Sequence, residues 1–203
     1  MKHHLMIATA LALLASPVLA QSQGDWTLGL GLAHVNPKSD NGALAGGTVP
    51  VEIGSSTRPS LTAEYFIRDN LGVELLAALP FKHAIRSNGV EIGTVKQLPP
   101  VVTLQYHFDA SDRFKPFVGV GVNFTGFWDG DARGPLSGSE LRVKNSWGLA
   151  AHVGGDYWIS DRAAIRADLR WIDIDSGVEL NGSRIGTVAV DPVVVGVSYV
   201  MKF

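Results

Sequence analysis

The sequence contains no cysteine, so disulfide bonds cannot stabilise this protein. Charged residues make up only 18% of the chain, and a formal net charge of -2 gives no basic excess for binding nucleic acid. After residue 20, no apolar run reaches the ~20 residues that a membrane-spanning helix needs. If the remaining chain lies in a membrane, it must cross as strands, because only helices and closed β-barrels satisfy the backbone polar groups in lipid.

The amino-terminal residues have the pattern of an export signal. Lys2-His3-His4 precedes an apolar run from Leu5 to Ala15, and Ala20 ends a small-residue cleavage site. The order of these regions is typical of a secretory signal peptide. We therefore expect residues 1–20 to be removed and residues 21–203 to form one domain.

Apolar residues alternate with polar or small ones along most of the remaining chain, the period expected of strands with two different faces. Long polar connections alternate with short ones, which is typical of outer-membrane barrels with short periplasmic turns and long extracellular loops. The pattern predicts an all-β fold, an eight-stranded antiparallel transmembrane β-barrel. The alternating segments begin near residues 26, 60, 71, 98, 118, 147, 165 and 193; the long connections are 37–56, 83–94, 129–145 and 175–187, and the short ones lie near 68–70, 109–114 and 159–161.

Aromatic residues on the predicted outward face separate into two groups, as the two girdles of a membrane barrel require. A soluble secreted barrel of the lipocalin type would point its larger residues inward, whereas the inward face here carries glycines and charges. The periplasmic group is Trp26, Tyr65, Tyr106, Phe108, Tyr157, Tyr199 and Phe203, and the outer group is Phe81, Trp128, Trp147 and Trp171.

Several segments resemble the OmpW family of small outer-membrane proteins: "DNLGVELLAALPFKH", "LPPVVTLQYHF", "FKPFVGVGVNFT", "SWGLAAHVGGDYWIS" and "WIDID". They keep the family's order over nearly the whole mature chain. The resemblance implies a narrow apolar lumen that leads small hydrophobic molecules across the outer leaflet, as in AlkL-like members associated with alkane uptake. Arg170 departs from the family, which can place a large apolar residue there. The resemblance therefore does not determine the shape of any constriction in the lumen.

Three prolines are predicted to lie at one height in the outer half of neighbouring strands: Pro80, Pro99 and Pro100. Proline has no N–H to give to a strand ladder, so the ladder should be weak there. One interpretation is a bulge that re-aims the adjoining loop. The other is a lateral opening through which an apolar solute leaves the lumen for the lipid. Proline lowers the cost of such an opening because it leaves no donor unpaired.

The inward residues divide by height into an apolar outer half and a charged half nearer the periplasm. Buried charges are costly unless they pair, and an eight-stranded lumen is only just wide enough for side chains. We therefore expect the charges to pair and plug the lumen rather than conduct ions. The apolar lining is Val35, Leu76, Ala78, Val101, Ile172 and Val194, and the plug is Glu64, Glu74, Asp156, Arg166, Asp168, Arg170 and Lys202.

Catalysis and metal binding find little support in the pattern. His152 and Asp156 both face inward, but four residues of strand separate them by about 13 Å, too far for a hydrogen-bonded pair. His83 and His107 lie on other strands without metal-ligand spacing. We expect no enzymatic activity, no cofactor and no metal.

The sequence thus predicts an outer-membrane channel for passive uptake of small hydrophobic solutes, with lateral exit near the prolines. A structural or adhesive barrel whose loops bind partners is the alternative. Expected partners are outer-membrane lipid and lipopolysaccharide, the solutes, and the barrel-assembly machinery, with no nucleic acid. Phe203, with Tyr199 on the same face, resembles the carboxy-terminal signal that this machinery reads.

Overall fold

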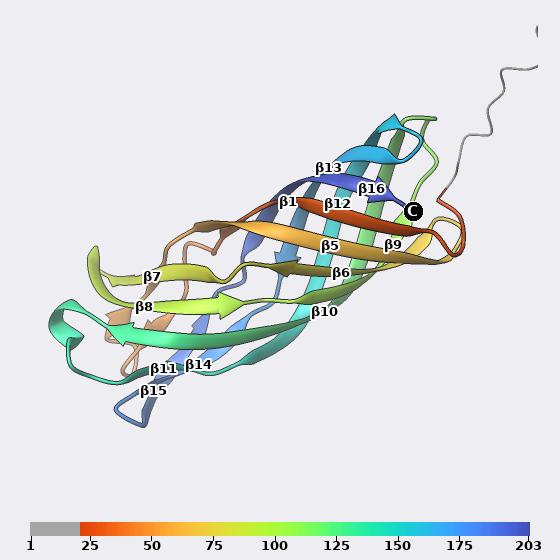
Figure 1. Ribbon diagram of the computed structural model, residues 1–203. Helices are drawn as coiled ribbons and strands as arrows, with labels where there is room; N and C mark the ends of the chain where they lie inside the picture. Colours follow the sequence, from red (N-terminus) through yellow and green to blue (C-terminus); the bar gives the residue numbers. More distant parts are fainter. Residues whose placement is uncertain (1–20) are drawn as a thin grey trace, which may run out of the picture.

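The computed structural model describes residues 21–203, so the predicted signal peptide, residues 1–20, lies outside the described residues. Eight strands form a closed antiparallel ring in the order β1-β5-β6-β9-β10-β12-β13-β16, with β16 returning to β1 (Figure 1). The sequence prediction of an eight-stranded barrel is confirmed. The ring strands are β1 (Trp26–Asn36), β5 (Ser56–Arg68), β6 (Leu71–Ala78), β9 (Val101–His107), β10 (Phe114–Ala132), β12 (Ser146–Ser160), β13 (Ala163–Ile172) and β16 (Val193–Lys202).

Both ends of the described chain lie at one end of the barrel, here called the inner end. The N–H of Phe203 donates to the carbonyl of Trp26 at 2.9 Å, which joins the last residue to the first strand. The short turns between ring strands also lie there, whereas the long connections leave the opposite, outer end (Figure 1). This arrangement matches the predicted alternation of short and long connections.

Much of the long connections is folded into strands that continue the wall beyond the ring (Figure 1). A strand of about 9–11 residues crosses a bilayer, so the 19 residues of β10 reach well past it. We call this region the outer extension. It contains β2 (Ala43–Leu44), β3 (Val49–Pro50), β4 (Glu52–Ile53), β7 (Phe81–Ser87), β8 (Val90–Leu98), β11 (Leu141–Val143), β14 (Asp175–Leu180), β15 (Ser183–Ala189) and the short 3-10 helix η1 (Gly134–Leu136).

Two Asn-Gly pairs close the hairpins of the outer extension. Asn88 and Gly89 connect β7 to β8 with φ of 48° and 77°, and Asn181 and Gly182 connect β14 to β15 with φ of 50° and 78°. Positive φ at both central residues is the requirement of a type I′ turn, which Asn-Gly meets at low cost. Residues 83–94 and 175–187, which we expected to be loops, are therefore parts of hairpins that the Asn-Gly pairs mark.

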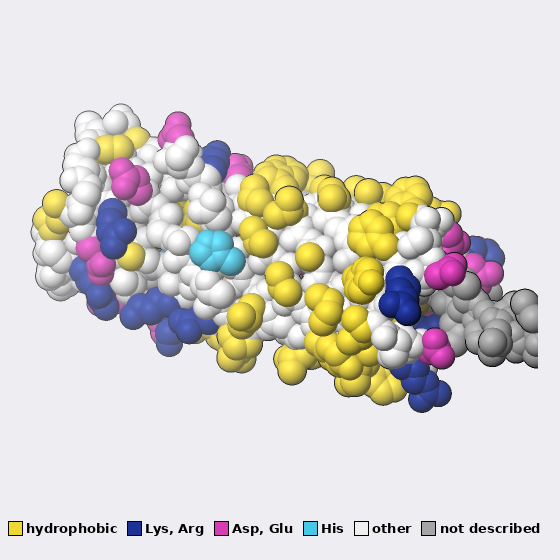
Figure 2. Space-filling view, turned by 90° about the horizontal axis from the view of Figure 1, so that it is seen from above, with side chains coloured by type: hydrophobic (Ala, Val, Ile, Leu, Met, Phe, Trp, Pro, Cys, Tyr) yellow, Lys and Arg dark blue, Asp and Glu magenta, His cyan; other side chains and the backbone are white. Residues whose placement is uncertain are grey.

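A broad band of apolar side chains surrounds the middle of the barrel, between two ends that carry charged residues (Figure 2). Leu30, Val120 and Leu149 are each more than 60% exposed on this band. Such a surface is costly in water and favourable in lipid. Within residues 21–203, no helix is long and apolar enough to cross a membrane.

Phe81 corrects one sequence expectation. We predicted that it faces outward in the outer aromatic group, but it is 1% exposed and lies inside the barrel. Between the pairs Leu76↔Val101 and Phe81↔Gln97, the chain advances five residues on one side and four on the other. The extra residue beside Pro80 acts as a bulge and exchanges the inward and outward faces of the strand.

Candidate functional site

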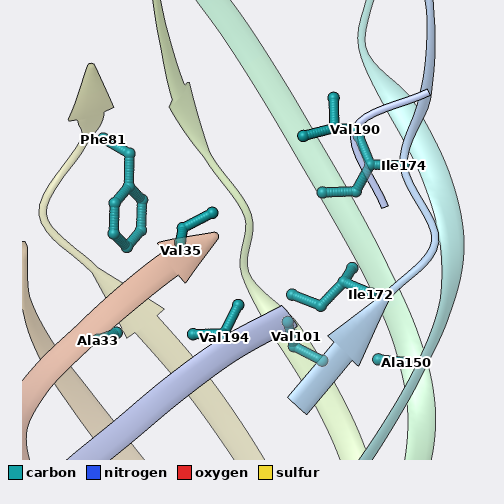
Figure 3. Close-up of a cluster of buried hydrophobic side chains, with 9 residues drawn as sticks. All are labelled: Ala33, Val35, Phe81, Val101, Ala150, Ile172, Ile174, Val190 and Val194. Carbon is teal, nitrogen blue, oxygen red and sulfur yellow. The ribbon is translucent and has the colours of Figure 1, made fainter. Parts of the chain in front are cut away.

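The outer half of the lumen is filled by one apolar cluster, which we call the outer lumen. Its buried side chains come from ring strands β1, β9, β12, β13 and β16, from β7, and from the connections after β13 and β15. They point toward one another (Figure 3). All six predicted lining residues belong to it, four as buried members and Leu76 and Ala78 packed against them. The buried members are Ala33, Val35, Phe81, Val101, Ala150, Ile172, Ile174, Val190 and Val194.

A second apolar cluster continues the first into the outer extension and encloses a small cavity of about 40 Å³. Its buried residues include Ile85, Val95 and Val188. Ile53 and Phe127 pack against both clusters. Apolar side chains therefore line most of the path from the outer extension to the middle of the lumen, beside the polar side chains of His83 and Gln97.

Below the outer lumen, buried charged and polar side chains form a polar network centred on Arg166. Its guanidinium donates to Asp156 at 2.7 Å, to Glu74 at 2.5 Å and to Glu64 at 3.1 Å. It also lies 4.7 Å from the centre of the Phe117 ring. One arginine thus compensates three buried carboxylates, which is the condition for keeping such charges inside a protein.

Arg170 and the buried histidines complete the polar network. Arg170 donates to Glu74 at 2.6 Å and contacts Nδ1 of His152 at 2.8 Å. His107 contacts Glu64 at 2.9 Å. The fold thus gives His107 and His152 partners within the network.

The polar network crosses the full width of the lumen. Arg166 and Arg170 lie on β13, and Glu74 lies on β6. In the ring order, these two strands are four steps apart and so face each other across the axis. Ion pairs between them span the lumen at this height, and the plug remains our prediction for this arrangement.

Glycines on the lumen face make room for the network. A side chain at Gly72 would collide with the Glu64 carboxylate, and one at Gly119 would collide with the His152 ring. Overpacking a filled interior is destabilising. These glycines therefore serve packing.

Two residues predicted for the plug lie at its margin. Lys202 does not pair with the network: its ammonium lies 3.6 Å from Asp25 and 5.8 Å from the Trp158 ring centre. The strand brings Lys202 to the inner end, below the network, so its assignment to the plug is corrected. Asp168 contacts Arg170 only at 4.0 Å, and its side chain is 16% exposed.

The prolines interrupt the wall between two neighbouring strand pairs. Pairing of β6 with β9 ends at Leu76↔Val101 and resumes between β7 and β8 at Phe81↔Gln97. Residues 77–80 and 98–100 therefore face one another without ladder pairs, with Pro80 exposed and Pro99 buried.

Backbone groups beside this interruption form hydrogen bonds with the strands on their other sides, β5 and β10. The N–H of Leu79 donates to the carbonyl of Pro59 at 3.0 Å. The carbonyl of Pro100 accepts from the N–H of Phe124 at 3.1 Å and from the side-chain amide of Asn123 at 3.0 Å. Pro100 is thus bonded to β10, while Pro80 and Pro99 border the interruption.

Besides Phe81, sequence reasoning missed the inward residue Arg58. Along β5, Ser60 and Glu64 are buried and Thr57 and Pro59 are exposed, so the even-numbered residues face the lumen. Arg58 follows that parity and is half-buried. Extending the alternation of segment 60–67 by two residues would have found it.

Charged residues at the inner end tie the turns together. The Lys115 ammonium and the Asn70 amide each donate to the Asp109 carboxylate at 2.8 Å. These hydrogen bonds hold the pKa of Asp109 below its usual value. Tyr199 and Phe203, predicted to act in assembly, both lie exposed at this end.

A closed eight-stranded barrel with an apolar belt, a lumen spanned by ion pairs and termini at one end is an outer-membrane β-barrel of the small, narrow class. The comparisons make this specific: the model of the OmpW family matches residues 22–203. The chain belongs to the OmpW family, whose members are non-enzymatic barrels of the outer membrane.

Individual relatives agree over most of the chain. Outer membrane protein W of Escherichia coli (strain K12) is 38% identical over 189 residues, covering 89% of each chain. Outer membrane protein AlkL of Ectopseudomonas oleovorans is 30% identical, covering 88% of this chain and 83% of the relative. The crystal structure of OprG from Pseudomonas aeruginosa superposes with a TM-score of 0.82 at 31% identity, covering 91% of this chain and 98% of that one.

Proposed function

We propose that this barrel admits small hydrophobic molecules passively from outside the cell. They enter through the outer extension, occupy the outer lumen and leave sideways into the membrane between residues 77–80 and 98–100. The two apolar clusters, against both of which Ile53 and Phe127 pack, support entry. The polar network supports sideways exit, because an apolar solute would lose favourable contacts and separate paired charges if it continued downward.

The interruption of the ladder is the observation that carries this proposal. Lipid-exposed backbone without hydrogen bonds is costly, and Pro80 and Pro99 border the gap without an N–H to lose. The cavity of about 40 Å³ is much smaller than the ~150 Å³ that holds a benzene molecule in a protein core. Entry therefore requires side chains of the outer extension to move.

A double variant tests the exit route. Pro80→Val with Pro99→Val supplies two N–H groups at the interruption and should narrow it, so uptake of a labelled alkane by cells carrying the protein should fall severalfold. Pro100→Val is the matched control, because Pro100 bonds toward β10; its uptake should stay near that of the parent. Equal uptake by the parent and the folded double variant would support a structural bulge instead.

A charge in the outer lumen tests the entry route. Val101→Asp buries a carboxylate among the apolar residues of the outer lumen and should weaken binding of an apolar ligand by roughly 1–3 kcal/mol. Binding of a long-chain alkane to the protein in lipid nanodiscs would measure this. Unchanged affinity would place the ligand elsewhere.

A further inference from the structure

Arg58 is a positive charge that the fold leaves without a counterion. None of the ion pairs among the described residues includes it. Its Nε is buried and has no hydrogen-bond partner within residues 21–203. A guanidinium has five N–H donors, so Arg58 retains the capacity to bind an added acceptor.

The polar network is too far away to supply that partner. Arg58 lies six residues along β5 from Glu64, which corresponds to roughly 20 Å at the rise of a strand. The neighbouring strand places Ala33, a member of the outer lumen, directly beside Arg58. The guanidinium therefore originates in the apolar half of the barrel, not in the charged half.

Arg58 also lies at the height of the interrupted wall. Ser60 pairs with Ala78, so Arg58, two residues further toward the outer end, is level with Pro80. The strand that carries His83, β7, packs against β5. The His83 ring is already bonded to the Gly54 carbonyl and the Gln97 amide, at 2.5 Å and 3.0 Å, and offers no negative charge in return.

We propose that Arg58 determines specificity by binding the carboxylate of an amphipathic solute that has a single apolar chain. The planar guanidinium fork matches a carboxylate with two parallel hydrogen bonds. The chain of the solute would pack against the outer lumen, and the adjacent interruption would let it move into the lipid. The inference rests on the proposed function and names a solute class for it, a medium-chain fatty carboxylate.

The width of the lumen favours one chain over two. An eight-stranded barrel is only just wide enough for side chains, and the outer lumen is already filled with them. A two-chain phospholipid could present an anionic phosphate to Arg58 but could not enter this space. The solute is therefore expected to carry its anion on one flexible chain.

Uptake by cells gives the first test, using decanoate and 1-decanol, which share a chain length and differ in charge at pH 7.5. Arg58→Met should lower decanoate uptake about tenfold, the equivalent of ~1.4 kcal/mol, and leave decanol uptake unchanged. Arg58→Lys keeps the charge but not the planar fork, so its decanoate uptake should lie between that of the parent and that of Arg58→Met. Arg86→Met removes an exposed arginine of β7, and its uptake of both solutes should match that of the parent. Equal effects on both solutes, or no effect on either, would overturn the assignment.

Direct binding gives a second test that does not depend on transport. In lipid nanodiscs, the nitrogen-15 NMR signal of the Arg58 Nε–H, identified by its loss in Arg58→Met, should shift with decanoate and not with decanol. Migration on unheated gels would show that each variant is folded. No shift with decanoate would refute the role of Arg58. A shift without uptake by the parent would instead uphold Arg58 as a carboxylate site and count against the proposed function.

Discussion

At the scale of single residues, the polar network is defined by how many partners each charge has. Arg166 is bonded to three carboxylates, whereas Asp168 lies 4.0 Å from a single arginine and is partly exposed. Removing one partner of a buried ion pair leaves an uncompensated charge, at a cost of about 3–5 kcal/mol. The number of partners that a charge has in the network therefore determines how much stability its substitution costs.

Arg166→Gln should lower the free energy of unfolding by about 3–5 kcal/mol, while Asp168→Asn should cost under about 1 kcal/mol because it breaks only a long contact. Urea unfolding in lipid vesicles, followed by tryptophan fluorescence, measures both. Apolar uptake by folded protein should remain near that of the parent in each variant. Similar losses of stability in the two variants would contradict this ranking of partners.

At the scale of elements, the turn between β9 and β10 is joined to the preceding turn through Asp109. Its pKa is lowered, first by the hydrogen bond from Lys115 and then by that from Asn70. A carboxyl whose pKa is lower in the folded state stabilises the protein above its unfolded pKa of about 3.9, and the contribution is lost as the pH falls through the folded value.

Asp109→Asn should therefore lower stability at pH 7, by at most about 1 kcal/mol because the carboxylate is largely exposed. The difference from the parent should shrink as the pH is lowered below about 4. Urea unfolding of vesicle-embedded protein across this pH range is the measurement. Asp112→Asn, on the same turn but in no ion pair among the described residues, should show little difference at either pH. A difference that grew on acidification would reverse the assigned sign.

At the scale of the whole molecule, an apolar outer half lies above a charged closure that joins opposite walls. A continuous water-filled pore is incompatible with this arrangement. In planar bilayers, the parent should pass ions rarely, while folded Arg166→Ala with Arg170→Ala should conduct more often because the closure is gone. Large, persistent conductance of the parent would exclude the plug and, with it, the requirement for sideways exit.

Alternation alone determined a great deal about this protein. With strands of period two, long and short connections in turn, and no apolar helix after residue 20, few folds other than a membrane barrel were possible. The same alternation placed Val35, Val101 and Ile172 in the outer lumen and Glu74 and Arg166 below it, because parity fixes which face of a strand looks inward.

The tertiary structure decided two things that alternation along one strand does not determine. These are the face that a residue takes beyond a bulge and the partner that it meets on another strand. A single extra residue beside Pro80 moved Phe81 from the expected outer surface to the lumen. Register between strands determined that Arg166 meets three carboxylates and that Lys202 meets Asp25 instead. Within residues 21–203, it leaves Arg58 without a carboxylate partner. Pairing partners depend on distances around the ring, and these are set only when the barrel closes.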